Sequence, residues 1–234
     1  MGTFAQFNKL WYLRRVNLFA GISDHEMREL AHRTTMRTVD RGHVIVRPDE
    51  SPEIIYVIKE GRVKVSRYSP DGREQILALL EPGDVIGELA LVQEPEAVHV
   101  EAFEDTLVCG MHREDFLGLI RRQPELMLQV MRALADRLRA AEEEIVDLVF
   151  RNVPGRLASL LLRLAQAYGR PTPNGQQLGL RLTHHDIGAM IGATRETVTA
   201  VLSRLREERV IAFDQRHIVI LDLERLRRLT STPE

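Results

Sequence analysis

The chain has little cysteine, little lysine and no long apolar run. Its 234 residues include one cysteine, Cys109, which excludes an internal disulfide, an iron–sulfur cluster and a zinc finger. Lysine occurs only at positions 9, 59 and 64, so arginine carries most of the positive charge. No apolar stretch approaches the roughly 18 residues that span a bilayer, and the N-terminus shows no signal-peptide pattern. We therefore expect a cytoplasmic protein without membrane contact.

Charge is distributed unevenly along the chain. Residues 151–234 contain 13 Arg and 8 acidic side chains, a net charge of +5. Residues 1–150 contain 19 basic and 26 acidic side chains, a net charge of −7. A basic C-terminal part is typical of a region that meets an anionic partner. A random scatter of solvated charge is the alternative.

The region from about residue 40 to 111 has the pattern of an antiparallel β-roll. Glycines and prolines separate short apolar runs, and Ser69–Gly72 is the expected hairpin turn. A short helix precedes the strands, with Ser23 as its N-cap. Cys109 is expected to be a buried small hydrophobic residue. The expected strands are GHVIV, EIIYVI, RVKVSRY, QILALL, DVIGELAL, VHVEAF and TLVCGM.

A long helix is expected from about Pro124 to Phe150. Its apolar residues alternate at spacings of 4 and 3, the a/d pattern of a coiled coil, and charged residues flank them. So narrow a seam suits a parallel partner helix and predicts a homodimer. The alternative is packing on the helix's own β-domain, and part of the helix can do both. The seam residues are Met127, Met131, Leu134, Leu138, Ala141, Ile145 and Leu148.

Residues 183–211 have the pattern of a helix-turn-helix. Thr183 and Asp186 form a helix-start signature, Gly192 can adopt the positive φ of a tight turn, and Thr194 can cap the second helix. A strand-like segment follows and would form a wing with Arg216 near its tip. The expected buried faces are Ile187, Met190 and Ile191 on the first helix and Val198, Val201, Leu202 and Leu205 on the second.

The outward face of the second helix carries side chains that suit DNA. Arg195 and Glu196 stand at its first turn, where an arginine can donate to guanine and a glutamate can accept from cytosine. Thr199 lies one turn further and is a third candidate base reader. The alternative is a solvated helix start in which Arg195 and Glu196 pair with each other. Contacts to DNA phosphates are expected from Thr183, Thr194, Ser203, Arg204 and Arg216.

The order of β-roll, long helix and winged helix-turn-helix resembles the Crp/Fnr family of bacterial transcription regulators. The segments DGREQILALLEPGDVIGELAL, GRLASLLLRLA and IGATRETVTAVLSRLREERVI carry the resemblance, which extends from about Leu18 to Ile220. The implied fold class is α+β, with a cyclic-nucleotide-binding-like domain in residues 1–123, a dimerisation helix in 124–151 and a DNA-binding domain in 152–234. The resemblance also implies a homodimer on a near-palindromic operator, and contact of the loop Ala167–Gly175 with RNA polymerase.

The sequence departs from the cAMP-responsive branch of that family at the nucleotide pocket. Gly87 and Glu88 match the GE motif of that branch, but Glu96 and Ala97 replace its phosphate-binding Arg-Ser pair. Its two base-contacting hydroxyl residues correspond to Ala141 and Glu142, and its third base-reading arginine to Ala200. A carboxylate about 4 Å from a phosphate repels it by about 1 kcal/mol even in bulk water. We therefore expect a degenerate effector pocket, and a changed base preference at one position of each half-site.

These features predict a sequence-specific transcription regulator, an activator, that needs no cAMP, cofactor or metal. One alternative keeps the regulator but assigns a cationic or uncharged effector near Glu88 and Glu96. Another is a cupin-like enzyme, which would need several histidines and a carboxylate at metal-ligand spacing. The segment VHVE supplies one histidine, and no phosphate-binding GxxxxGK[ST] loop occurs. Haem sensing also stays open, although four histidines are expected to be ordinary surface or pocket residues: His25, His32, His43 and His99.

Overall fold

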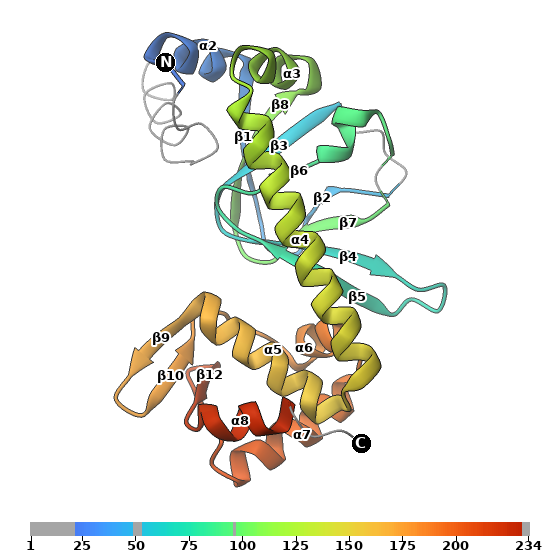
Figure 1. Cartoon of the computed structure of the whole chain (residues 1–234), viewed down its shortest axis with the longest axis vertical. Coiled ribbons are helices and arrows are strands. Elements are labelled where there is room, and N and C mark those ends of the chain that lie inside the picture. The colour runs from blue at the N-terminus through green and yellow to red at the C-terminus, as the bar shows by residue number, and fades with distance from the viewer. Residues whose placement is uncertain (1–21, 49–52, 96, 231–234) are drawn as a thin grey trace. The chain divides into compact units, whose positions relative to one another are not determined.

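The computed structural model describes residues 22–48, 53–95 and 97–230 of the chain. These residues form two compact units, which are described separately below (Figure 1). Among the described residues, those up to Arg67 and Leu77–Leu138 belong to the first unit, and Tyr68–Ile76 and those from Arg139 onward belong to the second. No helix in the described ranges has the length and hydropathy of a transmembrane segment.

Residues 34–112 form two four-stranded antiparallel sheets, which confirms the predicted β-roll. The glycines expected in turns, Gly42, Gly61, Gly72 and Gly83, all have positive φ. The Gly72 N–H donates to the Ser69 carbonyl at 2.8 Å and closes the predicted hairpin turn. One sheet has the order β1 (Thr34–Val39), β8 (Thr106–His112), β3 (Ile54–Glu60), β6 (Val85–Ile86), and the other the order β2 (Val44–Val46), β7 (His99–Ala102), β4 (Val63–Tyr68), β5 (Glu74–Leu80).

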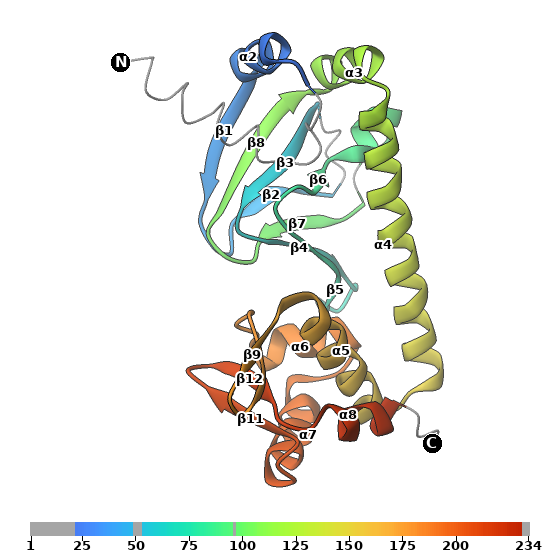
Figure 2. The same cartoon turned by 60° about the vertical axis from the view of Figure 1, so that its left-hand side comes forward.

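Helices pack against the outer face of the first sheet. Helix α2 (Asp24–Arg33) has Ser23 as its N-cap, as predicted, and Ser23 also forms a capping box with Glu26. Helix α3 (Arg113–Arg122) follows β8 and lies with α2 at one end of the sheet (Figure 2). Phe116 of α3 is fully buried, and its truncation to alanine should cost about 3–5 kcal/mol. The start of α4 (Glu125–Phe150) adds Leu126 and Val130 to the same core.

Three features of the first unit differ from the sequence prediction. Strand β1 lies before the expected β-region, and α3 was not predicted. The expected strand DVIGELAL is wrong beyond Ile86, because Gly87 adopts the left-handed conformation at φ 82° and ends β6. A 3₁₀ helix, η2 (Glu88–Val92), follows instead.

The second unit holds the winged helix-turn-helix. Its sheet has the order β11 (Ile211–Asp214), β12 (His217–Ile220), β10 (Gly175–Leu178), β9 (Gly169–Thr172). Its helices are α5 (Val153–Tyr168), α6 (His184–Ile191), α7 (Arg195–Glu207) and α8 (Leu223–Thr230). The unit also receives the C-terminal half of α4, which ends at Phe150 as predicted.

Residues 167–175 are not the loop expected from the sequence. They include the end of α5, strand β9 and the turn to β10. The sequence LGLRL at Leu178–Leu182 has the pattern of a short strand, but the strand lies earlier, at Gly175–Leu178, where polar Gln176 and Gln177 pair with β9 and β12. Leu178 and Leu180 are buried, so their apolar pattern marks core contact rather than strand length.

Candidate DNA-binding and effector sites

Backbone capping fixes the turn between α6 and α7. Thr183 and Asp186 form a reciprocal capping box at the start of α6, as predicted. Gly192 ends α6 in the left-handed conformation at φ 61°, and the Ala193 N–H donates to the Gly188 carbonyl at 3.0 Å. A Cβ at Gly188 would lie 2.6 Å from the Ala193 carbonyl oxygen, so a larger residue there would push the turn open.

Helix α7 buries one face and exposes the other. Thr194 caps the helix by accepting from the Thr197 N–H at 3.2 Å, as predicted. The apolar positions Val198, Leu202 and Leu205 are at most 3% exposed, as expected, whereas Val201, the fourth expected position, is only partly buried. The stripe sets the helix rotation, and this rotation leaves Arg195, Glu196, Thr199 and Ala200 on the exposed face.

Arg195 and Glu196 are exposed at the first turn of α7. In the described part of the chain neither side chain makes a hydrogen bond or ion pair, so the pairing between them that the sequence left open is not formed. A guanidinium and a carboxylate therefore stand side by side with their hydrogen-bonding capacity unused.

The residues expected to meet phosphates differ in how they are engaged. Both the N–H and the hydroxyl of Thr183 donate to Asp186 Oδ2, at 2.8 and 2.7 Å, so a phosphate would have to displace that carboxylate. The Arg204 Nε donates to Glu208 at 2.8 Å, which lowers the pKa of Glu208; Arg225 contributes less. Arg216 is exposed in the β11–β12 turn with φ 71°, and Ser203 is partly exposed on α7.

The effector-type site contains an internal ion pair. Gly87 turns the chain so that Glu88 starts η2. The Arg137 Nη1 donates to Glu88 Oε1 at 2.7 Å, and its Nη2 donates to the Val85 carbonyl at 2.6 Å. Both side chains are less than a quarter exposed. The residue opposite Glu88 is therefore an arginine from α4, which the sequence analysis missed because it read Arg137 as a solvated flank of the coiled coil.

The other expected pocket residues are placed only in part. Glu96 lies outside the described residues. Ala97 is exposed, and its carbonyl accepts from the Arg67 Nε at 3.2 Å. Ala141 and Glu142 are exposed on the half of α4 that belongs to the second unit. Arg67 is therefore a second arginine that the sequence analysis missed, and it lies beside the segment that contains Ala97.

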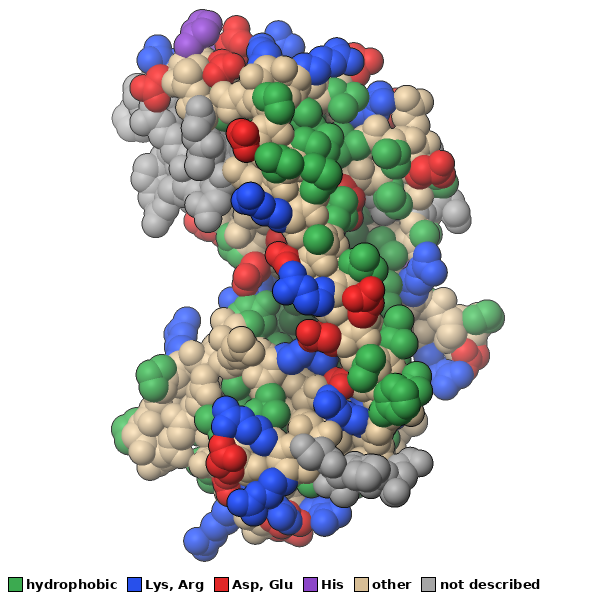
Figure 3. Space-filling model, viewed as in Figure 1, with side chains coloured by type: hydrophobic (Ala, Val, Ile, Leu, Met, Phe, Trp, Pro, Cys, Tyr) green, Lys and Arg blue, Asp and Glu red, His purple; other side chains and the backbone are tan. Residues whose placement is uncertain are grey.

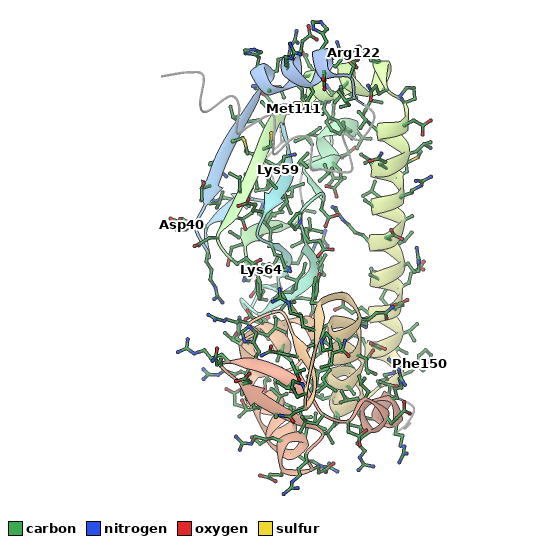
Figure 4. All side chains as sticks on the ribbon, turned by 90° about the vertical axis from the view of Figure 1, so that its left-hand side faces the viewer. Asp40, Lys59, Lys64, Met111, Arg122 and Phe150 are labelled. Atoms are coloured by element: carbon green, nitrogen blue, oxygen red, sulfur yellow. The ribbon has the colours of Figure 1, made fainter. Side chains whose placement is uncertain are left out.

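Apolar side chains on α4 are exposed in the single chain. Among the predicted seam residues, Met131, Leu134, Leu138, Ile145 and Leu148 are 39–62% exposed. Figure 3 shows hydrophobic side chains interleaved with charged ones along the face of this helix that is turned to the viewer. Val146, Val149 and Phe150 are also exposed, and Phe150 projects from the end of α4 in Figure 4. The heptad pattern did not include these three.

Both parts of the chain match known protein families. Residues 36–123 match the cyclic nucleotide-binding domain, and residues 155–229 match the Crp-like helix-turn-helix domain. In the described residues, no group of three or more His, Cys, Asp or Glu could hold a metal ion.

Relatives with matching sequence cover most of the chain. It is 32% identical over 217 residues to the CRP-like cAMP-activated global transcriptional regulator of Mycobacterium tuberculosis, covering 92% of this chain and 97% of the relative. It is 33% identical over 188 residues to the Global nitrogen regulator of Synechocystis sp., covering 79% and 84%. The solved structure of FixK2 from Bradyrhizobium japonicum superposes with a TM-score of 0.73 at 28% identity, covering 86% and 99%. These relatives are regulators rather than enzymes, which sets the cupin-like alternative aside, and the chain belongs to the Crp/Fnr family of DNA-binding transcription regulators.

Proposed function

We propose that the protein is a homodimeric transcription activator that binds a near-palindromic operator without needing cAMP. The observation that carries this proposal is the unused pair Arg195 and Glu196 on the exposed start of α7. The arginine offers two donors that match guanine O6 and N7, and the glutamate accepts from cytosine N4. Thr199 is the third base reader. The contacts to the phosphates of the operator come from Thr183, Thr194, Ser203, Arg204 and Arg216.

The test is fluorescence anisotropy with a palindromic family-type operator and a scrambled duplex, at fixed salt, with and without millimolar cAMP. Fixed salt is needed because phosphate contacts make affinities salt-dependent. Selective binding that cAMP does not change is the expected result. Selective binding that appears only with cAMP would overturn the independence from cAMP. Binding that ignores sequence under every condition would overturn the operator.

Independence from cAMP is supported by the Glu88–Arg137 pair. A ribose hydroxyl that donates to Glu88 would compete with a charge-assisted hydrogen bond of 2.7 Å inside the chain. Arg137 donates one N–H of each terminal nitrogen to Glu88 and Val85, so these two N–H groups are not free for a phosphate. The competent conformation is then favoured at rest. Thermal unfolding with millimolar cAMP should show no upward shift, because a ligand that binds the native state raises its stability by RT ln(1 + [L]/Kd).

The homodimer is supported by the exposed seam of α4. Leu138 is 62% exposed in the centre of the heptad pattern. Leu138→Glu should therefore convert the dimer to a monomer in sedimentation velocity, because each seam position meets its counterpart in a parallel coiled coil. Leu128→Glu is the matched control, since Leu128 is exposed on α4 but lies outside the seam. A dimer that survives Leu138→Glu would exclude this seam as the interface.

We propose that residues 167–175, which include β9 and the turn of the β9–β10 hairpin, contact RNA polymerase. Pro173 and Asn174 form its exposed turn. Replacing both with glycine should reduce activated transcription in a purified system while operator binding stays unchanged. Equal activation by the wild type and the variant would exclude this hairpin as the contact with RNA polymerase. Repression of transcription by the wild type would exclude the activator role.

A second candidate is the same regulator with a cationic effector in the first unit. A hollow of about 640 Å³ favours it, because its lining includes Glu53, Glu94, Glu114 and Asp115. His112 and Arg113 also line it, and Asp115 already pairs with Arg33 at 2.7 Å. A thermal-shift screen with polyamines and amino acids tests this candidate. The absence of any stabilising compound would count against it.

A further inference from the structure

The helix-turn-helix contains a hydrogen bond that links its two helices through exposed side chains. His184, the first residue of α6, places its ring Nδ1 2.7 Å from the Thr199 Oγ1 on α7. The same Thr199 oxygen donates to the Arg195 carbonyl at 2.8 Å. Thr199 is exposed and His184 is half-buried, so the pair sits at the edge of the surface that carries Arg195 and Glu196.

The hydrogens of this pair can be assigned by counting donors. A carbonyl oxygen only accepts, and a threonine hydroxyl has one hydrogen. The hydroxyl hydrogen of Thr199 is therefore used on the Arg195 carbonyl. Hence His184 Nδ1 must carry the hydrogen that joins the two side chains, which makes Nε2 of the neutral ring a lone-pair acceptor.

The atoms that the pair still offers to a partner are acceptors. Thr199 Oγ1 has one remaining lone pair, and its hydrogen is engaged. A DNA phosphate also brings only lone pairs, so this pair suits the backbone poorly. In the major groove the donors on base edges are the amino groups of adenine N6 and cytosine N4. The chemistry therefore matches a base that carries an amino group.

We propose that His184 is a positioning residue that fixes the Thr199 hydroxyl as an acceptor, so that α7 selects adenine or cytosine at one base of each half-site. This rests on the proposed function, because it needs α7 in the major groove. Ala200 lies beside Thr199 and presents only a methyl group, so the choice at this base is left to the threonine.

The test uses the full chain, a randomised duplex library and sequencing of the bound fraction, at fixed salt and pH 8. The wild type should enrich adenine or cytosine at one base beyond those read by Arg195 and Glu196. Thr199→Val removes the acceptor at nearly constant volume and should reduce that enrichment about 5-fold, the typical worth of one hydrogen bond. His184→Ala should reduce it similarly, and the double variant should lose no more than about 2-fold beyond either single variant, because the two residues act as one unit.

Two further variants separate positioning from a structural link. His184→Asn keeps an N–H donor toward Thr199 and should retain the preference. His185→Ala is the matched control, since that neighbouring histidine contacts Glu74 at 3.3 Å instead of α7 and should leave every base preference unchanged. Thermal unfolding of each variant accompanies the sequencing. A uniform loss of affinity for all duplexes in His184→Ala, with base preferences intact, would overturn the proposal.

The outcomes also separate this inference from the proposed function. If the wild type shows no base preference at any position, the operator-binding proposal fails. If it selects bases through Arg195 and Glu196 but prefers guanine or thymine, or nothing, at the Thr199 position, only the role of the His184–Thr199 pair fails.

Discussion

The two candidate sites differ in whether their charged side chains are paired within the protein. In the first unit, Glu88 is held by Arg137 at 2.7 Å, and both groups are mostly buried. On α7, Arg195 and Glu196 are exposed and have no side-chain partner among the described residues. Both regions contain an arginine and a glutamate, so residue type alone does not mark a binding site. A charge whose hydrogen bonds are already made inside the fold has less to offer a ligand than one left open.

The sharpest way to break this comparison is Arg195→Ala. A bidentate arginine–guanine contact contributes about 1–3 kcal/mol of discrimination. A dimer has two such contacts, so operator affinity should fall by about 2–6 kcal/mol. Binding to a scrambled duplex should change little. Fluorescence anisotropy with both duplexes measures the difference.

Arg204→Ala is the control for this experiment, since Arg204 is a proposed phosphate contact and is exposed near the other end of the same helix. Loss of a phosphate contact weakens binding to all duplexes alike and lowers the salt slope by about 1 per contact. An Arg195→Ala protein that still distinguishes the operator as well as the wild type would show that α7 is read differently.

Substitutions of Lys59 and Lys64 test how much a buried positive charge lowers the stability of the first unit. Lys59 lies on β3 and Lys64 on β4, the next strand along the chain, and they are 7% and 8% exposed (Figure 4). Burial lowers the pKa of Lys59 to about 8, against a smaller opposing attraction from Cys109. Lys64 has a carboxylate partner, Glu101, at 3.3 Å. Lys59→Met should raise the free energy of unfolding at pH 7 by about 1–3 kcal/mol, because the charged form is disfavoured in the folded state.

The sign of the pH dependence follows from the lowered pKa of Lys59. Between pH 8 and the ordinary lysine value of 10.5 the unfolded chain binds more protons, so the stability of the wild type rises with pH. The advantage of Lys59→Met should therefore shrink across this window in urea unfolding. Lys64→Met should destabilise instead, because it leaves Glu101 without its cation. Equal effects of the two substitutions would contradict this assignment.

Arg137→Met asks whether the Glu88 pair stabilises the fold. Removing one partner of a mostly buried pair leaves a carboxylate in a poor environment, so the free energy of unfolding should fall by about 1–2 kcal/mol. Glu88→Gln combined with Arg137→Met should recover part of this loss. A double-mutant cycle by urea unfolding gives the coupling energy. Coupling near zero would mean that Glu88 is as available to a ligand as Glu196 is to DNA.

Much of the second unit could be predicted from the sequence because its signals are local. Thr183, Asp186, Gly192 and Thr194 act on their own helix ends, and each has the predicted role. His184 lies between two of these signals and was passed over, because its partner Thr199 is 15 residues away on another helix. The heptad spacing located α4 to within one residue of its start.

The first unit shows where such reading stops. Arg137 meets Glu88 across 49 residues of sequence, and no periodicity indicates that contact. The strand expected after Asp84 ended early because one glycine adopts positive φ. Apolar runs predict burial well, but they do not tell a strand from a 3₁₀ turn of the same hydropathy. The sequence analysis expected no cation at the effector pocket because it considered only Glu96 and Ala97, which align with the family's phosphate-binding pair. In the structure the cation beside Glu88 is Arg137, which comes from α4.

The smallest effect concerns Glu144, on the half of α4 that belongs to the second unit. Burial raises its pKa, while Arg163 and a 2.9 Å hydrogen bond from Gln75 oppose the shift. A carboxyl with a raised folded pKa stabilises the fold most below its unfolded pKa, and this stability is lost as pH rises through the folded pKa. Glu144→Gln should therefore raise stability at pH 7 by a few tenths of a kcal/mol, since the group is partly solvated, and by nothing near pH 4. Urea unfolding at both pH values measures this difference in stability. Equal gains at pH 4 and pH 7 would mean that the effect comes from packing and that the Glu144 carboxylate is no more penalised by burial than the exposed charges of α7.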